Sequence, residues 1–257
     1  MKIRKLWEIA RETFYLLMRG PVFLPALFFS IIVAAFAAIA SSWGVAEFRK
    51  ILFDIGSFGF HFIGNLVAII WSIKILAVSR MEGSLEVQLA SPVSRSSWLI
   101  GRFAGIVLTL LLTGFLMLAI WQATMLLTDF GLMTLSEFLS LTLQILGWCV
   151  VAAMALFFAS FCGLITALFA SFSLWIAGLL TELIADTMGH DGALSLQIFF
   201  KFLVKVWNLQ SFNRGPSELM DHGLTIFGYT SLYGLVLMGF FISAASLSFT
   251  RASNLAS

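Results

Sequence analysis

The run from Phe138 to Thr181 extends for 44 residues without one charged side chain. A single helix over this run, at about 1.5 Å per residue, would be about twice as long as the hydrocarbon core of a bilayer is thick. The run therefore predicts two membrane-spanning helices, over residues 138–161 and 164–185. We expect the turn between them within Ser160–Ser173.

The rest of the chain has the composition of an integral membrane protein. Hydrophobic residues make up 60% of the 257 and charged residues only 11%, whereas an ordinary soluble domain carries about 25% charged residues. Apolar runs over residues 22–46, 55–78, 99–128 and 223–250 are each long enough to cross a bilayer as a helix. We therefore predict one all-α membrane domain over residues 1–257, with six transmembrane helices.

The distribution of charge predicts the orientation of these spans. If the N-terminus lies in the cytoplasm, the inner segments carry mainly Lys and Arg, and the outer segments carry mainly Asp and Glu. This is the asymmetry of the positive-inside rule. Because the number of predicted spans is even, we expect both termini in the cytoplasm.

Two shorter elements are predicted beside the spans. Residues 1–20 place apolar and charged side chains at helical spacing, which is typical of an amphipathic helix in the inner membrane interface. Residues 194–209 are apolar but too short to cross, and they carry Lys201 and Lys205 one helical turn apart. They predict a short helix that dips into the outer leaflet before the sixth span.

A polar insert over residues 79–95 separates the second span from the third and is predicted to project into the cytoplasm. Its apolar side chains recur every four residues, at Met81, Leu85 and Leu89. On a helix they would form one stripe, with Glu82 and Glu86 beside it. Pro92 would end this helix, since the residue before a proline is pushed out of the helical region. The pattern favours a helix that docks on a soluble partner over a solvated connecting loop.

The insert also resembles a known family. The residues Glu82-Gly83-Ser84-Leu85-Glu86, followed by Leu89, Pro92 and Arg95 and then by Gly101-Arg102, resemble a signature of bacterial type 2 ABC permeases. Ser84 stands where that family usually has threonine. Near the C-terminus, Phe212 and Gly215 are similar to the family's F-x-x-G element before the last helix. The six spans, the amphipathic start and the outer helix fit the same pattern.

The resemblance implies a permease subunit of an ATP-driven ABC transporter, an exporter in the bacterial plasma (inner) membrane. The insert would then be the coupling helix that docks on a cytoplasmic ATPase. Its implied contact residues are Met81, Glu82, Gly83, Ser84, Leu85, Glu86, Leu89, Pro92 and Arg95. The implied partners are two copies of the ATPase subunit, a second permease subunit (the same chain or a different one) and the lipid bilayer, with no nucleic acid.

The sequence itself shows no catalytic motif. It lacks the G-x-x-x-x-G-K-[ST] phosphate loop and the G-x-S-x-G nucleophile motif. We therefore expect no enzyme activity, metal or cofactor in this chain, and ATP and Mg would be bound by the partner ATPase. The alternative function is a non-transporting membrane anchor or assembly subunit of a larger complex.

Three polar residues within the predicted spans are candidates for a transport pathway. His61 and Asn65 lie one helical turn apart, and they either line a polar pathway or form hydrogen bonds at a helix interface. Lys74 is the only basic residue well inside a predicted span, and an ionisable group there is a functional candidate. Its long side chain could instead reach the inner headgroups, and we favour that interpretation.

Overall fold

The computed structural model describes residues 2–20, 23–43, 48–81, 94–127, 130–191, 207–220 and 222–254. Its helices are α1 (Lys2–Met18), α2 (Phe23–Trp43), α3 (Phe48–Met81), α5 (Arg95–Leu127), α6 (Leu135–Phe161), α7 (Leu164–Asp191) and α9 (Gly223–Asn254), with short 3₁₀ helices η1 (Leu209–Phe212) and η2 (Pro216–Leu219). No strand occurs in these residues. The predicted all-α class is confirmed.

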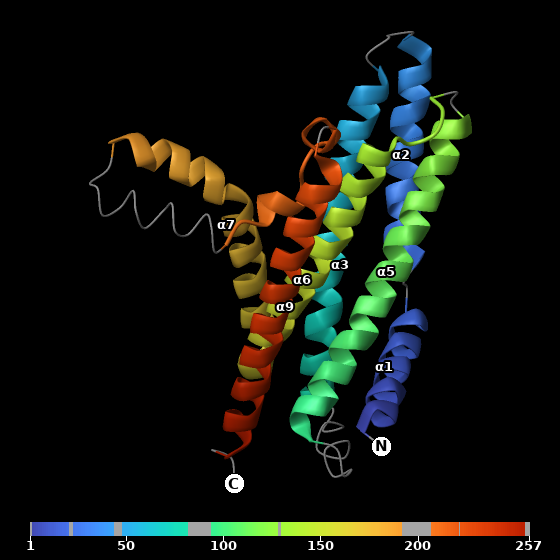
Figure 1. Cartoon of the computed structure of the whole chain (residues 1–257). Coiled ribbons are helices and arrows are strands. Elements are labelled where there is room, and N and C mark those ends of the chain that lie inside the picture. Colours follow the sequence, from blue (N-terminus) through green and yellow to red (C-terminus); the bar gives the residue numbers. More distant parts are fainter. Residues whose placement is uncertain are drawn as a thin grey trace.

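Five of the described helices are long and apolar enough to cross a membrane. These stretches are Arg49–Leu76, Arg95–Leu127, Leu135–Phe161, Leu164–Thr181 and Gly223–Phe249. They support a multi-pass membrane protein, as the composition predicts. In Figure 1 they form an elongated bundle, with α2 beside α3 and α5 and the last turns of α7 pointing away from the other helices.

The helices differ in extent from the apolar runs of the sequence. The break in the long charge-free run falls at Cys162 and Gly163, within the expected turn, because α6 ends at Phe161 and α7 begins at Leu164. Helix α3 begins at Phe48 rather than at residue 55, and α7 continues to Asp191 rather than ending at residue 185. A helix is defined by its backbone hydrogen bonds, so it can extend past the apolar run into charged residues.

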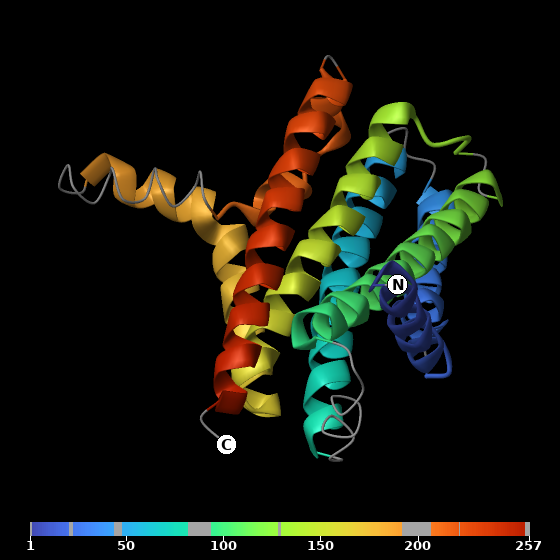
Figure 2. The same cartoon turned by 60° about the horizontal axis from the view of Figure 1, so that its bottom comes forward.

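Helix α6 is the central element of the bundle. It contacts α3, α5, α7 and α9, and these four helices surround it in Figure 2. Its residues from Val150 to Leu156 are all buried. This position explains why α6 carries no charged residue after Glu137: neighbouring helices bury most of its length, where a charge would not be solvated by water.

Large aromatic side chains fill the interface between α2, α3, α5 and α6. Trp121 of α5 packs edge-on against Phe29 of α2, with 5.7 Å between the ring centroids. The ring centroids of Trp148 in α6 and Phe60 in α3 lie 4.5 Å apart. A glycine permits this packing: a Cβ atom at Gly64 would lie only 1.8 Å from the Trp148 ring. The indole therefore rests directly on the backbone of α3.

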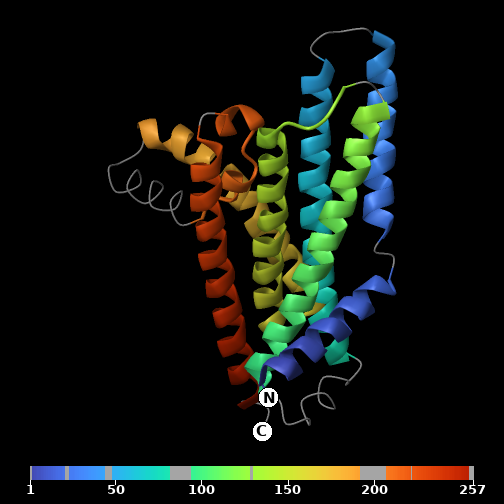
Figure 3. The ribbon, with the colours of Figure 1, turned by 45° about the vertical axis from the view of Figure 1, so that its right-hand side comes forward.

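The start of α1, the end of α3, the start of α5 and the end of α9 all lie at one end of the bundle, which we call the insert end (Figure 3). Residues 82–93, which hold most of the expected coupling helix, lie outside the described residues. Most of the expected outer helix over 194–209 also lies outside them, and its last residue, Leu209, is the first residue of η1. The expected N-terminal helix corresponds to α1.

Candidate functional site at the insert end

The insert leaves the bundle from α3 and re-enters it through α5. Of the expected coupling residues, Glu82, Gly83, Ser84, Leu85, Glu86, Leu89 and Pro92 lie outside the described residues. Met81 is the last residue of α3 and Arg95 is the first residue of α5. Residues 79–81 therefore continue α3, and a separate coupling helix does not begin at Ser79 as we expected.

The start of α5 is capped by the residue that precedes it. The backbone N–H of Ser97 donates to Ser94 Oγ at 3.3 Å, and the N–H of Trp98 donates to the Ser94 carbonyl at 3.0 Å. Serine is a preferred N-cap because its side chain satisfies an N–H group that has no partner within the helix. The described chain therefore becomes helical again immediately after Ser94.

A buried arginine joins α5 to α1. The side chain of Arg102 is only 3% exposed. Its Nη1 donates to Thr13 Oγ1 at 3.0 Å, and its Nη2 donates to Glu12 Oε1 at 3.1 Å. The guanidinium also lies 5.2 Å from the ring centroid of Trp98. A buried guanidinium requires such partners, because removing its charge from water is costly unless it is paired.

The backbones of α1 and α5 touch beside this arginine. A Cβ atom at Gly105 would lie 2.5 Å from the Ala10 carbonyl oxygen and 2.5 Å from Thr13 Cβ. A Cβ atom at Gly101 would lie 2.9 Å from Ile9 Cβ. Gly101 and Gly105 are four residues apart, which is the small-xxx-small spacing that permits close helix packing in membranes. Our sequence interpretation placed α1 on the membrane surface and missed this docking, although the glycine spacing was its visible signal.

Helix α9 completes the insert end from the other side. Ser246 Oγ donates to Ser96 Oγ at 2.6 Å, and the rings of Trp98 and Phe249 stack with 5.9 Å between centroids and 12° between planes. The first turns of α5 therefore contact both α1 and α9. Helix α9 is in turn linked to α6, because the hydroxyl of Ser248 forms a hydrogen bond with that of Ser160.

The contacts at the insert end join α1, α5 and α9 into one packed interface. The described residues contain no group of three or more His, Cys, Asp or Glu side chains that could hold a metal ion. The insert end instead combines a buried cation, close backbone contacts and stacked rings. Such packed interfaces shift as units rather than deforming gradually, so a displacement of the first turns of α5 would also displace α1 and α9.

The candidate pathway residues occupy two different faces of α3. His61 and Asn65 are buried, and Asn65 Nδ2 donates to the His61 carbonyl at 2.8 Å and lies 3.2 Å from His61 Nε2. The His61 ring lies 6.1 Å from that of Trp175 in α7. Lys74 is exposed and lies on the opposite face, one turn beyond Ile70. The three residues therefore do not line one continuous surface in this structure.

No protein-family model matches the sequence, and no curated protein is similar to it.

Proposed function

We propose that this chain is the membrane-spanning permease subunit of an ATP-driven ABC exporter in a bacterial inner membrane. Under this proposal α2, whose 21 residues carry no charge, is an additional span that brings the number to six, with both termini in the cytoplasm. Two copies of a cytoplasmic ATPase bind ATP and Mg, and a second permease subunit completes the transport pathway. The family resemblance of the insert supports this assignment.

The observation that carries the proposal is the set of contacts around the first turns of α5. Arg102 ties α5 to α1, and Ser96 and Trp98 tie it to α9. A segment that merely connected two spans would not need to re-enter the bundle at a junction of three helices. A movement that an ATPase imposed on the insert would be transmitted directly to all three.

The proposed docking surface is the apolar stripe of the insert. Leu85 and its apolar neighbours would fill a groove on the ATPase, and Glu86 would pair with basic groups at the rim of that groove. An arginine at either position would place a charge in the contact or reverse the sign of the pair. Both changes oppose docking while leaving the described helices untouched.

The test compares Leu85→Arg and Glu86→Arg with the wild-type protein purified from its native membrane. We expect wild-type preparations to contain the ATPase and to hydrolyse ATP, and both variants to lose most of the associated ATPase. Glu8→Arg is the matched control, because Glu8 is an exposed glutamate on α1 whose partner is Arg4 within the same helix. If both insert variants retain the ATPase and its turnover, the coupling assignment is wrong.

A membrane anchor would also lose its partner in the two insert variants, so a second measurement is needed. Inverted membrane vesicles that contain the complex are incubated with ATP or with a non-hydrolysable analogue, and their contents are compared by mass spectrometry. An exporter accumulates at least one compound only with ATP, and Leu85→Arg abolishes that accumulation. Identical contents under both conditions would favour the anchor.

A further inference from the structure

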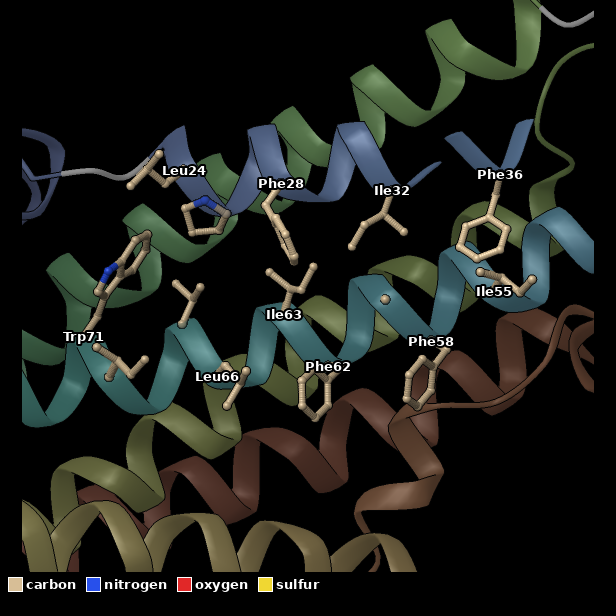
Figure 4. A pocket seen from close by; sticks show the side chains of 14 residues that line it. Leu24, Phe28, Ile32, Phe36, Ile55, Phe58, Phe62, Ile63, Leu66 and Trp71 are labelled. Atoms are coloured by element: carbon tan, nitrogen blue, oxygen red, sulfur yellow. The ribbon is translucent and has the colours of Figure 1, made fainter. Parts of the chain in front are cut away.

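A long apolar groove lies between α2 and α3, on the outside of the bundle. Its volume is about 830 Å³. None of its 14 lining residues is charged, and Trp71 alone carries a polar side-chain atom. Figure 4 shows Phe28 of α2 pointing toward Ile63 of α3. Phe28 and Phe58 are 59% and 68% exposed, so large aromatic surfaces remain uncovered along the groove.

The groove has the dimensions of one lipid chain. It extends along α2 from Leu24 to Phe36, which is about 18 Å at 1.5 Å per residue. One leaflet contributes half of a hydrocarbon core that is about 30 Å thick. In Figure 4, Leu24 and Trp71 lie at one end of the groove, and Phe36 and Ile55 lie at the other. An acyl chain that enters beside Trp71 would therefore contact the groove along its whole length.

Two cations are close in the sequence to the residues that mark this end of the groove, Leu24 and Trp71. Lys74 continues the groove face of α3, one turn beyond Ile70, and its side chain is exposed. Arg19 is exposed at the end of α1, five positions before Leu24. Neither cation forms an ion pair within the described part of the chain. A tryptophan next to cations is the arrangement that membrane proteins place at headgroup level.

We propose that this groove binds one anionic phospholipid, with an acyl chain between α2 and α3 and the phosphate at Lys74 and Arg19. A second copy of the chain fits less well. A two-fold symmetric contact along the membrane normal would place both copies of each cation at the same depth. Asp54, which is exposed one turn before Phe58, lies at the other end of the groove and too far from the cations to neutralise them. The lipid site is independent of the ATPase partnership.

The test uses native mass spectrometry of the full chain, released from micelles that contain equal amounts of phosphatidylglycerol and phosphatidylcholine with identical acyl chains. We expect wild-type protein to retain phosphatidylglycerol preferentially. Lys74→Gln and Arg19→Gln each weaken its retention about fivefold, the factor expected for one cation near an anionic surface. Lys50→Gln is the matched control, because Lys50 is an exposed lysine near the opposite end of α3.

The groove itself is tested with a variant that fills it. Gly59 lines the groove, and a Cβ atom there would make only ordinary contacts, 3.9 Å from the Phe29 ring. Gly59→Leu should reduce retention of both lipids, whereas Gly59→Ala should leave it nearly unchanged. Equal retention of the two lipids by wild type, or an unchanged preference in the double variant of Lys74 and Arg19, would overturn the proposal. A dimer that Gly59→Leu dissociates, with lipid retention unchanged, would assign the groove to a second copy.

Discussion

Arg102 Nη1 donates to Thr13 Oγ1 at 3.0 Å, although 89 residues separate the two in the sequence. Thr13 Oγ1 in turn donates to the Ile9 carbonyl at 2.8 Å, so the hydroxyl is fixed on both sides. This relationship makes α1 part of the packed bundle. It also places the helix that follows the insert in direct contact with the N-terminal helix.

The first prediction concerns the carboxylate that accompanies Arg102. Glu12→Gln should lower the free energy of unfolding by about 1–2 kcal/mol, because the buried guanidinium loses its charged partner. Glu8→Gln is the matched control on the same helix. The side chains of Glu8 and its partner Arg4 are 56% and 88% exposed, so their ion pair should contribute less than about 0.5 kcal/mol to the free energy of unfolding. Thermal unfolding in detergent measures both, and equal shifts would contradict the prediction.

The second prediction concerns the close approach of α1 to α5. Gly105→Ala should destabilise the protein by about 1–3 kcal/mol, because the added methyl would overlap the Ala10 carbonyl and Thr13 and push the helices apart. Gly239→Ala is the control, since a Cβ atom at that position of α9 meets nothing within 4 Å. The midpoints of thermal unfolding should fall for the first variant and stay constant for the second.

The third prediction compares two glycines of α3. Gly64→Ala would place a methyl group inside the Trp148 ring and should sharply reduce the yield of folded protein, whereas Gly59→Ala should be tolerated. The fraction of protein that elutes as a single species in size-exclusion chromatography measures the difference. Similar elution of the two variants would mean that Trp148 of α6 does not pack as closely against Gly64 of α3 as described here.

The fourth prediction concerns the end of the bundle opposite the insert. Glu137 Oε2 accepts hydrogen bonds from the Thr134 N–H at 2.6 Å and from Arg49 Nη2 at 2.8 Å, so one carboxylate caps α6 and binds α3. Glu137→Gln should cost about 1–2 kcal/mol, from a weakened cap and a lost ion pair.

Glu218→Gln provides the comparison for Glu137, because Glu218 pairs with Arg214 only four residues away and both side chains are partly exposed. Its removal should shift the thermal midpoint little. A shift as large as that of Glu137→Gln would show that the buried position of Glu137 adds nothing.

The fifth prediction tests the contact between α5 and α9. Ser96→Cys with Ser246→Cys should form a disulfide under mild oxidation, because the two hydroxyl oxygens are 2.6 Å apart. Ser97→Cys with Ser246→Cys should not, since Ser97 points along a different side of α5 and contacts Ser94. Both pairs are made in a background without Cys149 and Cys162, and linked peptides are identified by mass spectrometry. If Ser97→Cys forms the disulfide with Ser246→Cys and Ser96→Cys does not, the contact between α5 and α9 described here is wrong.

Parts of the fold can be predicted by comparing the length of each uncharged run in the sequence with the thickness of a bilayer. The run from Phe138 to Thr181 is too long for one helix, and its break at Cys162 and Gly163 lies in the expected region. The start of α3 at Phe48 could not be predicted from run length, because the uncharged run begins only at residue 55. One of its charged residues, Arg49, forms an ion pair with Glu137 of α6.

The sequence alone determined the class of protein and the break between α6 and α7, because composition and run length depend only on neighbours along the chain. The role of the insert and the count of six spans stay predictions. Only the tertiary structure decided that α1 docks on α5 through Arg102, and that Lys74 faces away from His61 and Asn65. These features depend on which helices become neighbours, and that is set by packing between residues far apart in the chain.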